Sequence, residues 1–266
     1  MSTTATVIQP PKAAICVVGN EVLSGKTLDT NSNYLAKFLF SRGIDLVRVS
    51  VIPDEIDVIV DTVRQFSSLV GPSGYVFTTG GIGPTHDDIT YESIANAFNV
   101  PLALHEETKT ALHDYLVASN RGNELNEDRL RMATFPQGCD VLHTSSWVPI
   151  VKMKNVYVLP GIPRLVHQMI ESTADHFKGI PIHQAVARTK KFEGDIASAL
   201  KTVARDYPSV MIGSYVNLKE EGIAFADRSY NVQVTLYSRV EADIHAALPL
   251  ALAAIDGWVH EDIKIE

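Results

Sequence analysis

The sequence predicts an α/β fold in which helices cover a mostly parallel sheet, followed by a small α+β lobe. As far as residue 180, apolar strand-like runs alternate with amphipathic helical segments, and strands end in glycine turns. This order is typical of a doubly wound domain. From residue 181 on, the order changes to strand, helix, strand, strand and helix, which is typical of an antiparallel sheet. We therefore expect a disordered tail over residues 1–12, a larger domain over 13–180 and an accessory lobe over 181–266.

The first half of the larger domain shows the clearest pattern. Its strands are continuous apolar runs, as in sheets that are buried on both faces. Its two helices carry apolar residues at helical spacing, and Asn31 and Asp54 stand where they can cap these helices. In chain order, we expect a strand over 13–18, a helix from 31, a strand over 46–52, a helix from 54 and a strand over 75–79.

The later elements follow from weaker patterns of the same kinds. In the larger domain, we expect helices over 91–98, 105–119 and 127–132, strands over 140–143 and 156–159, and a helix after Pro163. In the lobe, we expect strands over 183–189, 210–216 and 231–238, and helices over 194–205 and 240–255.

Composition argues against several classes of partner. The net charge is −8 and no run of Lys or Arg stands out, which argues against nucleic-acid and anionic-membrane binding. No apolar run approaches the roughly 20 residues of a membrane span. Cys16 and Cys139 form neither a metal knuckle nor a disulfide framework, so we expect a reducing, cytoplasmic location. A small anionic ligand would need help from backbone dipoles, a few cations or a metal.

The glycine turn after the third strand is the strongest candidate site. Gly80, Gly81 and Gly83 lie between a strand and a helix, so their N–H groups can form an anion site at a helix N-terminus. Asp87 and Asp88 lie in the same turn, and a phosphate cradle beside carboxylates suggests a divalent metal. The glycines can instead serve only a backbone that needs positive φ, and one of the carboxylates can be a helix cap.

Two familiar phosphate-binding motifs are excluded by spacing. The segment Gly19–Thr27 reads G-N-E-V-L-S-G-K-T, with five residues between its glycines where a P-loop has four. Gly80–Gly83 does not match the G-x-G-x-x-G dinucleotide fingerprint, because position 86 is His. Neither a P-loop nor a Rossmann cofactor site is expected.

Other candidates lie at the same edge of the predicted sheet. Asp29 can face Asp88, with a metal or a phosphoryl group between them. Glu21 follows the first strand and can point into the cleft or stay a solvated turn residue. His86 can contact phosphate or have no chemical role, and the rigid turn Pro160–Pro163 is a candidate cleft wall.

These motifs together resemble a known family, the molybdopterin-binding-like domain of the CinA type, which is also the N-terminal domain of eukaryotic FAD synthases. The matching segments are Gly19–Glu21, Leu23–Gly25, Asp29–Asn31, Thr79–Asp88 and Pro160–Pro163, with Asn126, Arg129, Met132, Ala133 and Pro136. Glu193–Ile196 and Ile212–Tyr215 resemble the small accessory lobe of the family.

The resemblance implies a three-layer α/β/α sandwich that is a nucleotide pyrophosphatase acting on ADP-ribose or FAD, with residues 13–180 as its catalytic domain. It implies catalytic roles for Asp88 and Asp29, and metal ligation by Asp29, Glu21, Asp87 and Asp88. The implied cofactors are a divalent metal, Mg²⁺ or a transition metal such as Co²⁺, and also K⁺. The implied partners are a small nucleotide substrate and further copies of the chain in a homo-oligomer. The implied substrate- and phosphate-binding residues are Gly19, Asn20, Ser24, Gly25, Asn31, Thr79, Gly80, Gly81, Gly83, Thr85, Pro160, Gly161 and Pro163.

The sequence also departs from the family. The usual G-T-A-P-G segment is replaced by Ser145–Pro149, which puts substrate contacts of that loop in question. These 266 residues show no counterpart of the reductase-like domain of FAD synthases or the amidase domain of CinA, so synthesis of FAD is not expected. A molybdopterin adenylyltransferase and a non-catalytic nucleotide-binding module remain alternatives.

Overall fold

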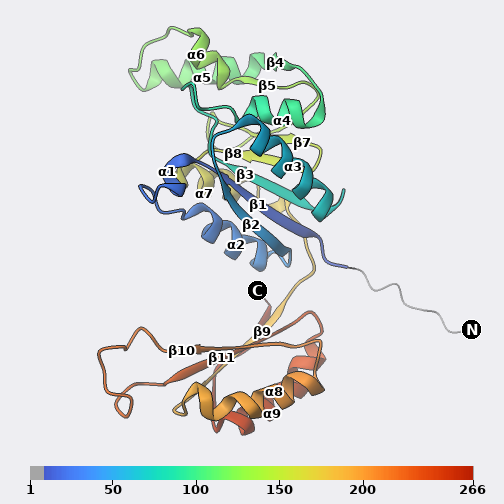
Figure 1. Ribbon diagram of the computed structural model, residues 1–266, viewed down its shortest axis with the longest axis vertical. Helices are drawn as coiled ribbons and strands as arrows, with labels where there is room; N and C mark the ends of the chain where they lie inside the picture. Colours follow the sequence, from blue (N-terminus) through green and yellow to red (C-terminus); the bar gives the residue numbers. More distant parts are fainter. Residues whose placement is uncertain (1–8, 266) are drawn as a thin grey trace, which may run out of the picture. The chain divides into compact units, whose positions relative to one another are not determined.

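The computed structural model describes residues 9–265, which form two compact units (Figure 1). One unit holds the described residues up to 40 and residues 44–179, and the other holds residues 41–43 and those from 180 on. The predicted tail over 1–12 falls largely outside the described range, but Lys12 already belongs to the first strand. Within the described range, no helix is long and apolar enough to cross a membrane.

The first unit alternates strands and helices along most of its length. Its elements are β1 (Lys12–Val18), α1 (Asn20–Leu23), α2 (Asn31–Ser41), β2 (Asp45–Ile52), α3 (Ile56–Val70), β3 (Tyr75–Thr79), α4 (Thr90–Phe98), β4 (Leu102–Leu104), α5 (Glu106–Ala118), α6 (Glu127–Arg131), β5 (Thr134–Pro136), β6 (Asp140–Leu142), β7 (Ile150–Met153), β8 (Val156–Leu159), α7 (Pro163–Ser172) and the 3₁₀ turn η1 (Ala174–His176).

A six-stranded sheet in the order β2-β1-β3-β8-β7-β6 forms the centre of this unit. The first four strands in this order are parallel to one another. At one edge of the sheet, β7 runs antiparallel to both of its neighbours, β8 and β6. The predicted mostly parallel sheet is therefore confirmed. The carboxyl ends of β1, β3 and β8 lie together, which is where open α/β sheets bind ligands.

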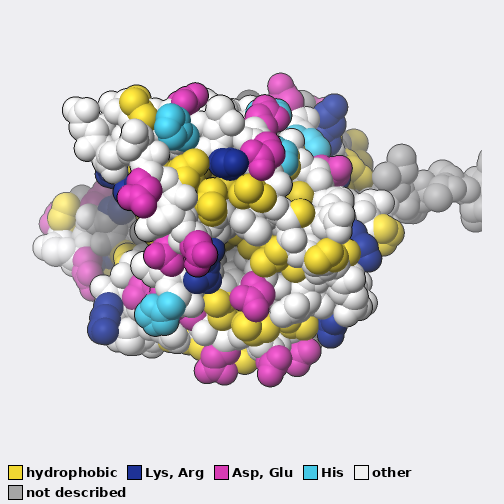
Figure 2. Space-filling view, turned by 90° about the horizontal axis from the view of Figure 1, so that it is seen from above, with side chains coloured by type: hydrophobic (Ala, Val, Ile, Leu, Met, Phe, Trp, Pro, Cys, Tyr) yellow, Lys and Arg dark blue, Asp and Glu magenta, His cyan; other side chains and the backbone are white. Residues whose placement is uncertain are grey.

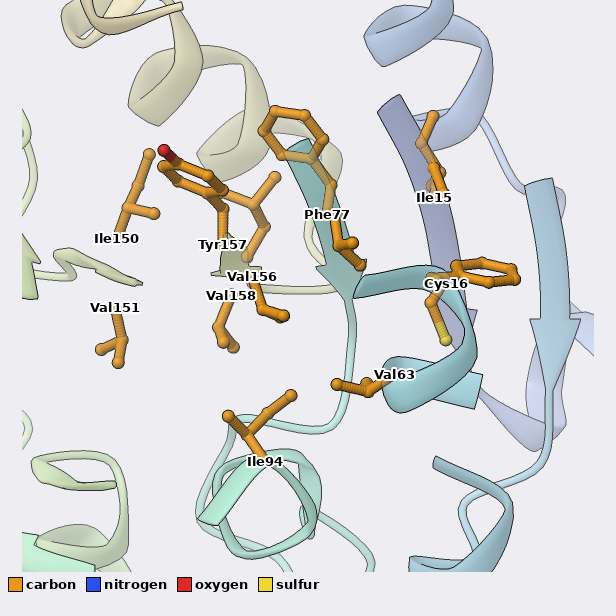
Figure 3. Packing of buried hydrophobic residues seen from close by; sticks show 14 of the residues in the cluster. Ile15, Cys16, Val63, Phe77, Ile94, Ile150, Val151, Val156, Tyr157 and Val158 are labelled. Carbon is orange, nitrogen blue, oxygen red and sulfur yellow. The ribbon is translucent and has the colours of Figure 1, made fainter. Parts of the chain in front are cut away.

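Both faces of the sheet are buried by helices. Figure 3 shows Phe77 and Tyr157 on one face, and Cys16 and Val158 on the other, toward Val63 of α3 and Ile94 of α4. Burial raises the pKa of Cys16 to about 12, so this thiol is a core residue.

On each face of the sheet, two helices contact each other. On the face of Phe77, α2 and α7 lie side by side, because the rings of Tyr34 and His167 stack with their centroids 3.7 Å apart. On the other face, Arg64 of α3 donates to the carbonyl of Ala97 in α4 at 3.0 Å. The result is the predicted three-layer α/β/α sandwich (Figure 1).

The second unit is an antiparallel sheet with two helices. Its elements are β9 (His183–Thr189), α8 (Glu193–Asp206), β10 (Met211–Val216), β11 (Val232–Ser238), α9 (Glu241–Ile255) and β12 (Trp258–Ile265), with strand order β10-β11-β9-β12. Its own apolar core includes Ile196 and Leu200 of α8 and Ile244 and Leu248 of α9. The predicted small α+β lobe is therefore confirmed.

Two predicted helix caps are wrong. Asn31 is the first residue of α2 and does not cap it, because both carboxylate oxygens of Asp29 accept hydrogen bonds from Ser32 instead. Asp54 does not cap α3, whose capping position is Glu55. Asp54 instead accepts the backbone N–H of Asn20 at 2.7 Å, which joins the ends of β1 and β2.

Candidate functional site

The glycine turn is a tight loop that presents backbone N–H groups. Gly80 and Gly81 have φ values of +102° and +66°, which favour glycine. The N–H of Gly80 donates to Leu159, but those of Gly81, Ile82 and Gly83 have no acceptor among the described residues. Three successive amides without acceptors form a nest suited to an anion.

This cradle is not the helix N-terminus that the sequence predicts. The helix α4 begins only at Thr90, and the N–H of Thr90 donates to the carbonyl of Gly81 at 2.9 Å. The hydroxyl of Thr90 donates to the carbonyl of Gly80, also at 2.9 Å. Thr90 therefore fixes the two glycine carbonyls, and the cradle depends on the turn itself.

The two carboxylates of the turn both accept from Thr85. Asp88 Oδ2 accepts the Thr85 N–H at 2.8 Å and the Thr85 hydroxyl at 2.5 Å, and Asp87 Oδ1 lies 2.6 Å from the same hydroxyl. Neither residue caps α4, whose capping position is Ile89, so that prediction is wrong. The hydrogen bond from Thr85 lowers the pKa of Asp87.

The Asp88 side chain lies directly over the glycines. A Cβ atom built on Gly83 would be 2.6 Å from Asp88 Oδ2, closer than real Cβ contacts allow. Arg131 of α6 donates to the backbone carbonyl of Asp88 at 2.9 Å. Thr85 therefore holds the carboxylate of Asp88 beside Gly83, and Arg131 holds the backbone of the same residue.

Acidic groups from the first two strands reach the same edge of the sheet. Burial raises the pKa of Asp54, the hydrogen bond from Asn20 lowers it in part, and the charges of Glu21 and Asp87 raise it again. Glu21 folds back over Gly19, where its carboxylate would be 2.7 Å from an added Cβ.

The turn at Pro160–Pro163 is tied to α2 and packs on the glycine turn. The buried Asn31 donates its side-chain amide to the carbonyl of Gly161 at 2.9 Å. A Cβ on Gly161 would be 3.5 Å from the Cα of Gly80. Asn31 therefore supports the wall of the site from outside it.

These parts enclose a cavity of about 730 Å³. Eight sequence-predicted residues line it, namely Glu21, Gly80, Gly81, Gly83, Asp88, Pro160, Gly161 and Pro163. Nine predicted residues are not among its lining residues, namely Gly19, Asn20, Ser24, Gly25, Asp29, Asn31, Thr79, Thr85 and Asp87. Of these, Thr85 and Asn31 donate hydrogen bonds to the lining residues Asp88 and Gly161, respectively.

One part of the cavity lining was missed by the sequence reasoning. It consists of Leu112, Tyr115, Leu116, Arg121, Trp147 and Val148. The available signal was Trp147, which lies in the segment that departs from the family pattern. On the face shown in Figure 2, acidic side chains are more prominent than basic ones. Arg121 and Arg129 line the cavity and are local sources of positive charge there.

The carboxylates do not form a preformed metal site. Among the residues that the structure describes, no group of three or more His, Cys, Asp or Glu side chains is arranged to hold a metal ion. Both oxygens of Asp29 are engaged by Ser32, and Asp88 Oδ2 is engaged by Thr85. The predicted metal ligation by Asp29, Glu21, Asp87 and Asp88 is therefore not assembled by the chain alone.

Comparison with known proteins identifies the family. Residues 14–178 match the family described as "Probable molybdopterin binding domain", to which the chain belongs. Residues 181–262 match the family described as "FAD synthase, middle domain". The expected likeness to CinA-type proteins and FAD synthases is thus confirmed over both units.

Relatives agree with this assignment. A protein of Archaeoglobus fulgidus is 34% identical over 203 residues, covering 76% of this chain and 84% of that protein. A probable FAD synthase of Caenorhabditis elegans is 33% identical over 237 residues, covering 80% of this chain but only 45% of that protein. The chain thus spans slightly less than half the length of that synthase.

A solved structure shares the larger unit. The CinA protein of Thermoplasma acidophilum superposes with a TM-score of 0.56 at 28% identity, covering 63% of this chain and 98% of that one. The shared part has the size of the six-stranded unit, which carries the cavity.

Proposed function

We propose that this chain hydrolyses the pyrophosphate bond of a dinucleotide-type substrate such as FAD or ADP-ribose. The observation that carries the proposal is a set of three adjacent N–H groups on the wall of the cavity, at Gly81, Ile82 and Gly83, for which residues 9–265 provide no acceptor. Backbone dipoles of this kind favour phosphate oxygens. The Asp88 carboxylate beside them supplies a group that can orient water.

The surroundings of the turn favour a substrate with its phosphates in the middle. Gly83, Asp88 and Tyr91 line the main cavity and also a second cavity of about 490 Å³. FAD and ADP-ribose carry adenosine on one side of the pyrophosphate, and riboflavin or ribose on the other. With the pyrophosphate at Gly83, each half has a cavity of its own.

The chemistry follows from these groups. Water attacks one phosphorus in line with the bridging oxygen, and the bond between that phosphorus and the bridging oxygen breaks. Asp88 accepts a hydrogen bond from the water, orients it and takes up its proton as the new O–P bond forms, while the amides of the glycine turn stabilise charge on the phosphate oxygens. The water oxygen stays on the attacked phosphate, the bridging oxygen leaves with the other phosphate, and the two monophosphates in their dianionic forms are released together with two protons.

All of these steps use groups of the chain itself. Dependence on a divalent ion such as Mg²⁺ or Co²⁺, and on K⁺, stays a prediction. A cytoplasmic location and self-association also stay predictions.

A second candidate is adenylyl transfer to molybdopterin, which the description of the matched family favours. The same cradle would then hold the phosphates of ATP. A third candidate is a nucleotide-binding module without catalysis, which would return its ligand unchanged.

The experiment that tests the proposal is product analysis by mass spectrometry. The folded protein is incubated with FAD or ADP-ribose, with and without added Mg²⁺. FAD should give FMN and AMP, and ADP-ribose should give AMP and ribose 5-phosphate. If neither substrate is cleaved by a well-folded sample under either condition, the proposal is wrong.

A further inference from the structure

Part of the cavity wall is formed by two aromatic rings from distant parts of the chain. Tyr115 lies on α5, and Trp147 lies on the loop between β6 and β7. Their rings stack with centroids 5.5 Å apart and planes inclined by 26°. Both residues line the cavity, and we call this pair the aromatic wall.

The loop that carries Trp147 is held in place by its own hydrogen bonds. The hydroxyl of Thr144 donates to the carbonyl of Val148 at 2.7 Å and accepts the N–H of Ser146 at 3.1 Å. Gln168 of α7 donates to the carbonyl of Ser145 at 3.3 Å. Trp147 is therefore positioned before any ligand binds, which reduces the entropy cost of binding.

The surroundings of the aromatic wall suit a flat ring. Leu112, Leu116 and Val148 are buried and add apolar surface to the lining of the cavity. The guanidinium carbon of Arg121 lies 5.9 Å from the centroid of the Tyr115 ring. An apolar lining, aromatic faces and a nearby cation together match the π-face of a nucleobase or a flavin.

We propose that the aromatic wall is the subsite for the planar heteroaromatic ring of the nucleotide, with Trp147 as its specificity-determining residue. The orientation of the ligand rests on the proposed function, which places the phosphates at the glycine turn. The same cavity is lined by Gly81 and Gly83 of that turn and by both rings of the aromatic wall, so it offers one ligand a place for its phosphates and for its ring. Ligands that carry adenine or a flavin should bind better than sugar phosphates without a ring.

Intrinsic fluorescence tests this directly, because the chain has only two tryptophans, Trp147 and Trp258. Trp258 lies on β12 of the other unit. In Trp258→Phe, the emission of Trp147 is isolated, and in the matched control Trp147→Phe, the emission of Trp258 is isolated. AMP, FMN and ribose 5-phosphate serve as the adenine, flavin and ring-free probes.

The emission of Trp147 should be quenched saturably by AMP, by FMN or by both, and not by ribose 5-phosphate. The emission of Trp258 should show no saturable change. The ring that binds more tightly at Trp147 identifies the preferred half of the substrate. Equal quenching in the two variants, or no saturable quenching of Trp147 by either ring-bearing probe, would overturn the subsite.

A second measurement separates ring stacking from folding and from hydrolysis. In Trp147→Ala, the dissociation constant of the ring-bearing probe, followed by calorimetry, should rise about tenfold, because stacking on an aromatic side chain contributes on this scale. Trp147→Phe should recover most of the affinity, and ribose 5-phosphate should bind all forms alike. Binding in both Trp147 variants that matches the unmodified protein would contradict the proposal.

The two proposals can fail separately. Quenching of Trp147 without any hydrolysis would leave the ring subsite and remove the pyrophosphatase. Hydrolysis with unchanged KM in Trp147→Ala would leave the pyrophosphatase and remove the ring subsite.

Discussion

Gly80 and Val18 lie in such close contact that a Cβ atom on Gly80 would be 2.1 Å from the carbonyl oxygen of Val18. Val18 is the last residue of β1 and Gly80 directly follows β3, so this contact joins the carboxyl ends of two neighbouring strands. The backbone of the glycine turn can approach β1 only because position 80 has no side chain. This approach places the free amides of the turn beside Glu21 in one cavity.

Gly80→Ala should therefore lower the free energy of unfolding by about 3 kcal/mol or more, from backbone strain together with the clash. Gly25→Ala is the matched control, because Gly25 also has a positive φ (+73°) but nothing lies within 4 Å of its added Cβ. Its loss should be about 1 kcal/mol. Urea unfolding measures both variants, and equal losses would show that the contact with Val18 does not matter.

Asp88→Asn should lower kcat by about 100-fold or more, because the amide orients water poorly and accepts no proton. The melting temperature should change little, since Asn can still accept the hydrogen bonds from Thr85. Asp87→Asn is the matched comparison, as Asp87 bonds to the same hydroxyl but is not among the residues that line the cavity. Steady-state turnover of ADP-ribose measures kcat in both variants, and the decrease should be much larger in Asp88→Asn than in Asp87→Asn. A fully active Asp88→Asn would exclude the role given to this carboxylate.

Asp54 should make stability depend on pH in a defined direction. Its pKa is raised from the usual 3.8 in the folded state, chiefly by burial. The folded state therefore holds the proton of Asp54 more tightly than the unfolded state does. The stabilisation that this proton gives to the folded state is fully present below pH 3.8 and is lost as pH rises through the raised pKa. Between about pH 3 and about pH 7, the stability of Asp54→Asn should improve relative to the unmodified protein.

Urea unfolding at the two pH values measures this change. Glu21→Gln serves as the second variant, because removing the charge of Glu21 should lower the pKa of Asp54 and shrink the pH effect. A stability difference between Asp54→Asn and the unmodified protein that stays constant with pH would contradict the assignment.

Removal of divalent ions should separate activity from stability. The described carboxylates form no preformed metal site, so EDTA should leave the melting temperature unchanged. Turnover of FAD or ADP-ribose should fall, and added Mg²⁺ or Co²⁺ should restore it, because Mg²⁺ commonly binds through one or two carboxylates and substrate phosphates. A large drop in melting temperature with EDTA would instead reveal a structural metal.

The sequence predicts those parts of the fold that depend on local pattern. The apolar runs at residues 13–18, 75–79 and 156–159 are strands because each is buried on both faces of the sheet. The short strands β4 and β5 escaped prediction, since each has three residues and forms only through pairing with the other. The antiparallel strand β7 follows a loop and gives no alternating signal.

The same limit applies to the candidate site. The residues of the glycine turn are contiguous in the sequence, so they could be predicted as a site from the sequence alone. Asp29 and Asn31 looked alike as candidates, yet Asp29 accepts hydrogen bonds from Ser32 in the first turn of α2 and Asn31 supports Gly161, because tertiary contacts decide which way each side chain points. Tyr115 and Trp147 come into contact only after α5 packs near the loop before β7, and the sequence of neither segment predicts this contact.

Hydrolysis in ¹⁸O-labelled water tests the central claim most directly. The intact protein is incubated with ADP-ribose or FAD, and both monophosphates are weighed by mass spectrometry. Attack by water on a pyrophosphate held in the glycine turn predicts equal amounts of the two monophosphates, with one ¹⁸O atom in one of them per cleavage event. No cleavage, or cleavage without ¹⁸O because the nucleotidyl group passes to another acceptor, would contradict the proposed pyrophosphatase.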